Sequence, residues 1–330
     1  MSSQPGSCIV FVLLLAVFSC TSKTEDVDVT PKGPFFGVIP KDYPQLLAPE
    51  LLASPLEEFN GTFNPEGTEF YYTTVVQENF SKGLISFTKL REDQSWTAPA
   101  VAHFSGEADD YDPLFNPDGS RLYFSSRRPA KDTLSPYKSN IWFIEREGEG
   151  WSAPVVLPFT KNDDYYSSLT RDGIIYFNVW STGNLFKAIP DGKHFEVKEL
   201  DSTINRPYDQ GDPFVSPDED YLIFRGYGND ALGRGDLYIS FNIDGNWTLP
   251  ENLGEPINSR AHEMCPYVSS DGSIFIFASG RLTKAYNTSP LTELSGIQEK
   301  FRTGDNGELN LYYMSTDFIE RLRQKHLDAK

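Results

Sequence analysis

A series of five similar segments constrains the fold of this chain more than any other feature. Each segment contains a short run of residues, a tight turn of the Pro-Asp-Gly type and an alternating strand, as in "DPLFNPDGSRLYFSS" from Asp112 and "DPFVSPDEDYLIFRG" from Asp212. Spacings of 52, 54, 46 and 53 residues separate the turn positions Pro65, Pro117, Arg171, Pro217 and Ser270. A period of about 50 residues is typical of repeat architectures, in which each repeat is one supersecondary unit.

Each repeat predicts a small antiparallel sheet. Proline and glycine supply the backbone angles of a tight turn, and an alternating strand follows it. A third strand comes after a variable loop, as in "NIWFIERE" (Asn140–Glu147). Three repeats then add a W-x-x-P segment, starting at Ser95, Gly150 and Asn246, and proline is tolerated there if the strand is at an edge. Four antiparallel strands per repeat predict the blades of a β-propeller.

The two ends of the chain are expected to close the ring. The fifth repeat has no W-x-x-P segment, and "PQLLAPELLAS" (Pro44–Ser54) resembles the missing strand. We therefore predict an all-β fold: one five-bladed propeller of four-stranded antiparallel blades over residues 44–318, closed by the N-terminal strand. Six blades, with residues 33–57 forming a degenerate one, are the alternative. Residues 319–330 predict a polar C-terminal helix or tail.

The N-terminus predicts export. Residues 1–19 contain an apolar run, Cys8–Ser19, which is short for a membrane-spanning helix and typical of a signal peptide. "VFSC" resembles a lipobox, which makes Cys20 the lipidated residue and residues 20–43 a flexible tether. We expect an outer-membrane lipoprotein, in the periplasm or at the cell surface, that contacts the membrane only through its lipid. The alternative is an ordinary cleaved signal in which Cys20 is incidental.

The segments "NPDGSRLYFSS", "SPDEDYLIF" and "GDLYISFNIDGNWTLPENLGEPINS" resemble the WD40-like repeats of TolB-type periplasmic propellers, which occur in many bacterial exported proteins. The resemblance covers nearly all of residues 44–318. It implies the propeller fold and no single activity, because such propellers bind proteins or sugars or serve as non-catalytic modules beside other domains.

The innermost strand of each blade is expected to begin at one mouth of the central channel. Carboxylates recur seven and five positions before the turn anchors, and they are Glu58, Asp110, Asp112, Asp164, Asp212 and Glu263. If the blades superpose, these groups converge, and they would suit a Ca²⁺ ion or acid and base catalysis at a glycosidic bond. The alternative is structural: the repeat needs these residues to cap strands and fix turns.

The second strands end at the same mouth with arginines, namely Arg127, Arg128, Arg225 and Arg281. One interpretation is that they grip an anionic ligand, such as a uronic acid or a peptide C-terminus, because arginine offers a planar fork to carboxylates. The other is that each pairs with an aspartate of a neighbouring blade. His262 stands beside Glu263 at the fifth entrance, where it is expected to be a hydrogen-bonding partner.

The rest of the sequence narrows the function. The formal net charge of −18 argues against nucleic-acid binding. Common catalytic and cofactor motifs are absent, and Cys265, the one cysteine in the predicted mature body, is expected in the core. We predict a monomeric, non-catalytic binding or assembly module for a protein or glycan, without a cofactor. The alternatives are a glycoside hydrolase or lyase that uses channel carboxylates, and an envelope-complex component recruited through the Gly280–Glu308 loop.

Overall fold

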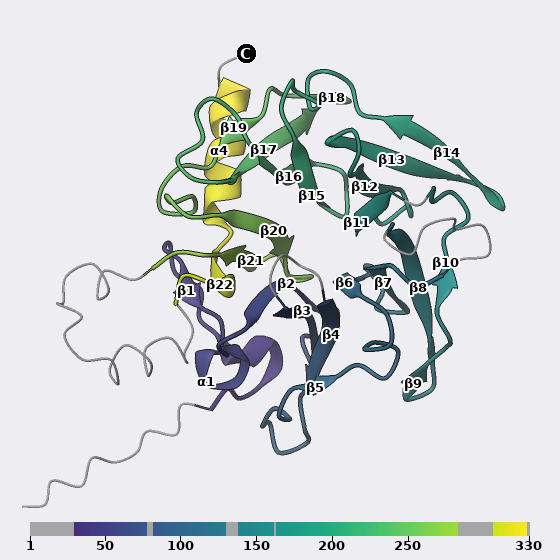
Figure 1. Cartoon of the computed structure of the whole chain (residues 1–330). Coiled ribbons are helices and arrows are strands. Elements are labelled where there is room, and N and C mark those ends of the chain that lie inside the picture. The colour runs from purple at the N-terminus through teal and green to yellow at the C-terminus, as the bar shows by residue number, and fades with distance from the viewer. Residues whose placement is uncertain (1–29, 78–81, 130–137, 162, 283–305, 329–330) are drawn as a thin grey trace, which may run out of the picture.

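The computed structural model describes residues 30–77, 82–129, 138–161, 163–282 and 306–328. Five antiparallel sheets stand around a central axis, and each sheet is one blade of a β-propeller (Figure 1). The predicted five-bladed ring is confirmed. The six-bladed alternative is wrong, because residues 33–57 contribute one short strand to the last blade and the first residue of blade 1, and form no blade of their own.

Each blade is an antiparallel path of four strands. Blade 1 contains β2 (Glu57–Phe63), β3 (Glu69–Gln77), β4 (Lys82–Lys89) and β5 (Ala100–Val101). Blade 2 contains β6 (Asp110–Phe115), β7 (Arg121–Ser126), β8 (Asn140–Glu147) and β10 (Val155–Val156). Blade 3 contains β11 (Asp164–Leu169), β12 (Ile175–Val179), β13 (Asn184–Asp191) and β14 (His194–Glu199). The first strand of each path lies nearest the axis (Figure 1).

The remaining blades follow the same plan. Blade 4 contains β15 (Gln210–Val215), β16 (Tyr221–Gly226), β17 (Asp236–Ile243) and β19 (Glu251–Asn252). Blade 5 contains β20 (Glu263–Val268), β21 (Ile274–Ser279), β22 (Asn310–Ser315) and β1 (Gln45–Leu46). The W-x-x-P segments of blades 2 and 4 each form two short strands, with β9 (Gly150–Trp151) and β18 (Asn246–Trp247) before the proline. Proline lacks an N–H, so it interrupts the ladder at that point.

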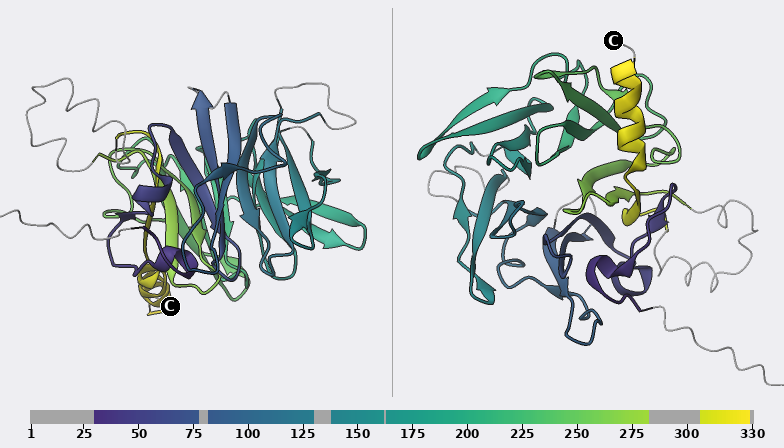
Figure 2. Two further views of the ribbon diagram at one scale, coloured as in Figure 1. Left: turned by 90° about the horizontal axis from the view of Figure 1, so that it is seen from below. Right: turned by 180° about the vertical axis from the view of Figure 1, so that it is seen from behind.

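The N-terminal strand closes the ring as predicted. Strand β1 pairs antiparallel with β22, with Gln45 opposite Tyr313 and Leu46 opposite Tyr312, and the short helix α1 (Pro49–Leu52) follows it. Helix α4 (Asp317–Asp328) leaves β22 and lies across the face of the ring that carries the tight turns (Figure 2). Thr316 Oγ1 donates to the carbonyl of Gly272 in one of those turns. The opposite face is therefore free of this helix.

Part of the segment assigned to the tether belongs to the folded body. The 3-10 helix η1 (Pro34–Gly37) places Phe36 in the core, with ring centroids 5.1 Å from Phe63 and 4.3 Å from Trp96. The indole Nε1 of Trp96 also donates to the Gly33 carbonyl at 2.9 Å. The fold therefore begins before residue 44. The predicted signal peptide and Cys20 lie outside the described residues. Within the part of the chain that the structure describes, no helix is long and apolar enough to cross a membrane.

Every inner strand carries a bulge at the same repeat position. The register of the first strand against the second shifts there in all five blades. The bulged residues are buried and have φ between 48° and 57°, and they are Asn60, Asp112, Tyr166, Asp212 and Cys265. Asparagine and aspartate tolerate this left-handed backbone better than most residues do. The bulge turns these five side chains toward the axis of the ring, and the predicted burial of Cys265 is confirmed.

Side chains of one blade hold the bulge of the next. The amide of Asp112 donates to Thr73 Oγ1 at 2.9 Å, the amide of Tyr166 donates to Ser125 Oγ at 2.8 Å, and the amide of Asp212 donates to Asn178 Oδ1 at 3.4 Å. These bonds cross from blade 1 to 2, from 2 to 3 and from 3 to 4. They satisfy amides that the bulge removes from the ladder, and so they fix neighbouring blades to one another around the channel.

Candidate functional site

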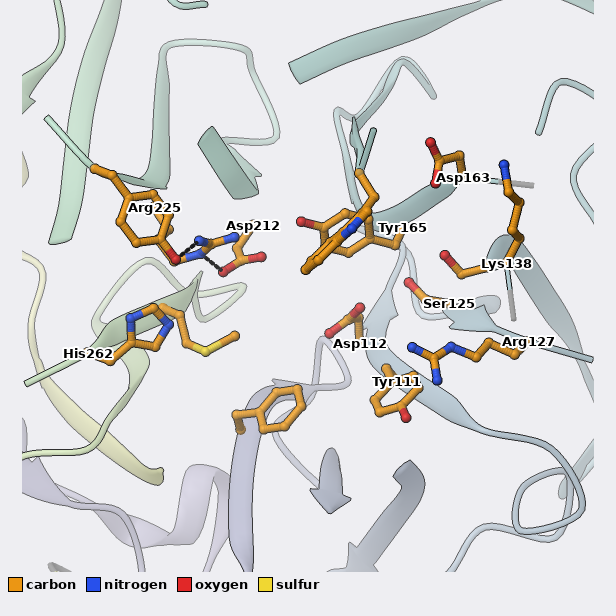
Figure 3. A pocket seen from close by; sticks show the side chains of 15 residues that line it. Tyr111, Asp112, Ser125, Arg127, Lys138, Asp163, Tyr165, Asp212, Arg225 and His262 are labelled. Atoms are coloured by element: carbon orange, nitrogen blue, oxygen red, sulfur yellow. Dashed lines mark hydrogen bonds and ion pairs between the residues drawn. The ribbon is translucent and has the colours of Figure 1, made fainter. Parts of the chain in front are cut away.

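A cavity of about 370 Å³ opens at the mouth where the inner strands begin and the second strands end (Figure 3). All five blades contribute to its lining. Its charged residues are Asp112, Arg127, Lys138, Asp163, Asp212 and Arg225, and its aromatic residues are Phe59, Tyr111, Tyr165, Trp180 and Tyr227. This volume falls within the range of small-ligand pockets, which is roughly 300–1,000 Å³.

One repeat position contributes to the wall in four of the five blades. It stands just before the bulge, and four blades place a large side chain there, namely Phe59, Tyr111, Tyr165 and Met264, all of which line the cavity. Blade 4 has Gly211 instead. A Cβ at Gly211 would lie 2.3 Å from Nη2 of Arg225, so glycine is required for the guanidinium to occupy this space. The missing side chain of blade 4 is therefore replaced by an arginine from the adjacent strand.

Arg225 departs from its own repeat position as well. It stands opposite Gly211 on β16, where the other blades carry the small or amide side chains Thr73, Ser125, Asn178 and Ala278. Its Nε donates to Oδ2 of Asp212 at 2.8 Å, and its Nη1 donates to the hydroxyl of Tyr227 at 2.5 Å. Burial opposes the charge of Arg225, but the Asp212 carboxylate outweighs this effect, and the pKa of the guanidinium is raised.

Asp112 and Asp212 occupy the bulge position of blades 2 and 4, and both side chains point into the cavity (Figure 3). Burial raises the pKa of Asp112 to about 7, and the negative charge of Asp212 contributes to this shift. Asp212 is instead paired with Arg225. Near neutral pH the floor of the cavity thus presents a carboxyl group that is partly protonated and a carboxylate that is held by a guanidinium.

His262 lines the cavity beside this pair. Burial lowers its pKa to about 4, and the neighbouring positive charge of Arg225 acts in the same direction. Its ring stacks on that of Tyr227, with centroids 6.4 Å apart and an interplanar angle of 27°. At pH 7 the imidazole is therefore neutral, and because the ring already forms a hydrogen bond with the backbone of Arg234, one ring nitrogen is left for a ligand.

Asp110 and Arg128 were predicted at the mouth, but they bind within blade 2 instead. The Asp110 carboxylate accepts from Ser126 Oγ at 2.6 Å, from Ser105 Oγ at 2.8 Å and from Arg128 Nη2 at 2.8 Å. The same Nη2 also donates to the carbonyl of Phe104. The side chain of Asp110 is fully buried, so this ion pair fixes the loop that leads into β6.

Glu263 and Arg281 repeat this arrangement in blade 5. The Glu263 carboxylate accepts from the hydroxyls of Ser259 and Ser279 at 2.6 Å each, and Arg281 Nη2 lies 3.4 Å away. Arg281 Nη1 donates to the carbonyl of Pro256 at 3.0 Å. In both blades the arginine pairs with a carboxylate of its own blade. The interpretation that each arginine pairs with an aspartate of a neighbouring blade is therefore wrong for Arg128 and Arg281.

Glu58 and Asp164 also hold loops. Glu58 accepts a hydrogen bond from the Ser54 hydroxyl, and burial raises its pKa to about 7. Asp164 Oδ2 accepts from the amide of Lys161 at 2.5 Å, and burial raises its pKa to about 6. Neither side chain lines the cavity. The predicted site residues that do line the cavity are Asp112, Arg127, Asp212, Arg225 and His262.

Sequence reasoning missed several lining residues, chiefly Trp180, Tyr165, Lys138 and Asp163. A signal for part of the site was present in the alignment of the repeats. The position before the bulge is large in four repeats and glycine in one, and its partner position is an arginine only in that same repeat. Both positions of this pair depart from the repeat in blade 4 alone, which indicates that their side chains have a different role there.

The Ca²⁺ ion considered from the sequence for the mouth carboxylates has no support in the geometry of the described residues. Among the residues that the structure describes, no group of three or more histidine, cysteine, aspartate or glutamate side chains is placed to hold a metal ion. Arg225 approaches Asp212 at the place where a cation would need a free carboxylate. We therefore propose no metal at this site.

Comparison with known proteins finds distant similarity to solved structures only. No family model and no curated protein matches the sequence. Among solved structures, a candidate TolB from Agrobacterium tumefaciens has a TM-score of 0.45 and 16% identity, over 68% of this chain and 71% of its own. TolB from Acinetobacter baumannii has a TM-score of 0.44 and 13% identity, over 80% and 55%. A mutant of the GH43 protein BlXynB from Bacillus licheniformis has a TM-score of 0.45 and 12% identity, over 72% and 51%.

Proposed function

We propose that this protein is a non-catalytic binding module that holds a short glycan segment in the cavity at the channel mouth. One observation carries the proposal: a solvent-exposed tryptophan and a buried arginine–carboxylate pair share a single cavity built by all five blades. Sites for small ligands combine apolar and aromatic walls with a few fixed polar groups in this way.

The aromatic side of the cavity suits the face of a sugar ring. Trp180 is 72% exposed, and its ring lies 5.6 Å from that of Tyr165 at an interplanar angle of 58°. The tryptophan ring is large and rigid, so it offers contact area at a small cost in conformational entropy. The C–H groups of a sugar face would cover this exposed surface.

The polar side of the cavity suits hydroxyl groups. A sugar hydroxyl both donates and accepts, and the site offers an acceptor in Asp212, donors in Arg225 and one ring nitrogen of neutral His262. Hydrogen bonds to charged partners are stronger than those between neutral groups. The Arg225–Asp212 pair is already formed and buried, so little ordering would accompany binding.

The test is titration calorimetry of the purified full-length chain against a panel of oligosaccharides. We expect micromolar or tighter binding by at least one glycan, and a loss of roughly tenfold in Trp180→Ala. Leu249→Ala is the matched control, because Leu249 is 64% exposed and does not line the cavity. If peptides bind and no glycan does, or if Trp180→Ala binds as the unchanged protein does, the proposal is wrong.

Glycan cleavage is a second candidate function. It is favoured by the presence of two carboxyl groups in one cavity, Asp112 with its pKa raised to about 7 and Asp212 paired with Arg225. Glycosidases use two such carboxyl groups in different environments as acid and as base or nucleophile. Release of new reducing ends that is lost in Asp112→Asn would establish this activity. Recruitment through Gly280–Glu308 remains a prediction, because residues 283–305 lie outside the described residues.

A further inference from the structure

One side of the cavity is formed by two basic residues that the neutral-sugar contacts do not use. Arg127 and Lys138 stand at the two ends of the β7–β8 connection, and both line the cavity. They lie on the side away from Arg225 and His262 (Figure 3). The Arg127 guanidinium rests over the ring of Tyr111, 5.6 Å from its centroid, which orients it toward the cavity wall.

The counter-charges around these residues are too few to neutralise them. Arg127 Nη1 lies 3.7 Å from Oδ2 of Asp109, and the other oxygen of the same carboxylate binds Lys82 Nζ at 3.3 Å. Within the described part of the chain, Lys138 forms no ion pair. The carboxylate of Asp163 also lines the cavity, where its Oδ2 accepts from the amide of Ser181 at 3.0 Å.

The lining at this edge thus holds two cations, Arg127 and Lys138, and one carboxylate, that of Asp163. The Asp112 carboxyl also lines the cavity, but its pKa is raised to about 7 by burial, so part of it is uncharged at neutral pH. The protein as a whole has a formal net charge of −18. Positive charge gathered in a cleft of an otherwise acidic surface attracts anions locally. The Arg127–Asp109 pair is long and one-third exposed on the arginine side, so a ligand anion can displace it at little cost. An arginine fork beside a lysine matches the planar geometry of a carboxylate.

We infer that the bound glycan is acidic, and that Arg127 and Lys138 bind a carboxylate carried on one of its sugar rings. This inference rests on the proposed glycan-binding function and adds the class of sugar. The cavity then has two parts. Trp180, Asp212 and Arg225 receive the ring and its hydroxyls, and the edge formed by Arg127 and Lys138 receives the charge.

The test uses matched pairs of oligosaccharides, each a uronic-acid form and its methyl ester, together with neutral and sulfated sugars. The full-length chain is titrated at low and at physiological salt. We expect the uronic-acid form of at least one pair to bind about tenfold or more tightly than its ester, with the preference falling as salt rises. In Arg127→Gln/Lys138→Gln the preference falls to about one, because the uronic-acid form loses the charged partners that distinguish it from the ester.

Arg121→Gln is the matched control, because Arg121 stands on the same strand β7 and pairs with the exposed Glu145 outside the cavity. Thermal unfolding of each variant checks the fold. Glycan binding with no preference for the acidic form, or a preference that survives the double substitution, overturns this inference and leaves the proposed function intact. Equal binding of sulfated and uronic forms overturns the assignment of a carboxylate. If no glycan of any kind binds, the proposed function itself is wrong.

Discussion

The arginines of blades 2 and 5 differ from that of blade 4 in what they hold. Arg128 and Arg281 lie just beyond the end of the second strand, and each binds loop carbonyls and a buried carboxylate of its own blade. Arg225 lies inside strand β16 and points into the channel, where it binds Asp212 and Tyr227. The ion pairs of Arg128 and Arg281 therefore hold loops of the ring, and the ion pair of Arg225 shapes the cavity.

The difference teaches how a repeated fold acquires a site. Gly211 and Arg225 change together, because the guanidinium fills the volume that a side chain at Gly211 would need. At the equivalent positions of blade 2, Tyr111 and Ser125 keep the pattern, and Ser125 holds the bulge of the next blade. In blade 4, Arg225 stands at the position of Ser125, so this blade has a buried charged group facing the channel in place of a hydroxyl that holds the next bulge.

The largest effect is expected when a loop-holding carboxylate is removed. Asp110→Ala leaves Arg128 without its buried partner and should lower the free energy of unfolding by about 3–5 kcal/mol, measured by urea denaturation. The control is Asp218→Ala, which breaks the exposed pair with Arg171 and should cost about 1 kcal/mol or less. Equal losses in the two variants would show that the carboxylate at the start of β6 does not hold the blade.

The next effect is a change in how stability depends on pH. The pKa of Asp112 is raised from 3.8 to about 7 in the folded protein, so the folded state binds its proton more tightly than the unfolded chain does. Stability from this group is therefore present at low pH and is lost as pH rises from about 4 through 7. Asp112→Asn removes this dependence.

The stability of Asp112→Asn relative to the unchanged protein should therefore rise by about 2–3 kcal/mol between pH 5 and pH 8. Denaturation at both pH values measures this difference directly. Because Glu58 and Asp164 also have raised pKa values, the comparison is made between the two proteins and not from one pH profile alone. An unchanged difference at the two pH values would contradict the buried, proton-binding role of Asp112.

The smallest difference in stability is expected between two variants of blade 4. Arg225→Ser leaves Asp212 buried without its partner and the space beside it empty. Gly211→Tyr combined with Arg225→Ser copies the pair found in blade 2 and also removes the partner of Asp212, but its tyrosine refills the space, so the double variant should have a free energy of unfolding about 1–2 kcal/mol higher than Arg225→Ser alone, measured by urea denaturation. Ligand affinity should fall at least tenfold in both variants. Retained affinity in the double variant would show that Arg225 is not part of the site.

The ring could be predicted because its signals are local and recur. Turn residues such as Pro117 and Gly119 repeat at a regular spacing, and the strand missing from the fifth repeat appears near the N-terminus as Gln45–Leu46. The packing of Phe36 was missed, because the short segment that contains it has no periodicity and depends on contacts with Phe63 and Trp96.

The site was less predictable because a bulge decides where its side chains point. Simple alternation along a strand cannot place Asp110 and Asp112, since the shift between Tyr111 and Leu114 alters the register of β6 against β7. Asp110 consequently binds its loop and Asp112 faces the channel. Trp180 comes from the short β12–β13 connection, whose place at the rim follows only from the assembled ring.

The double attachment of the N-terminal segment has a mechanical consequence. Phe36 is embedded in blade 1, and a few residues later β1 joins blade 5, so the segment crosses the joint between the first and last blades. A pull on the N-terminus would load the Phe36 contacts first and reach the β1–β22 pairing only after they yield. The packing of Phe36 would therefore protect the two-residue pairing of β1 with β22 from a force applied at the N-terminus.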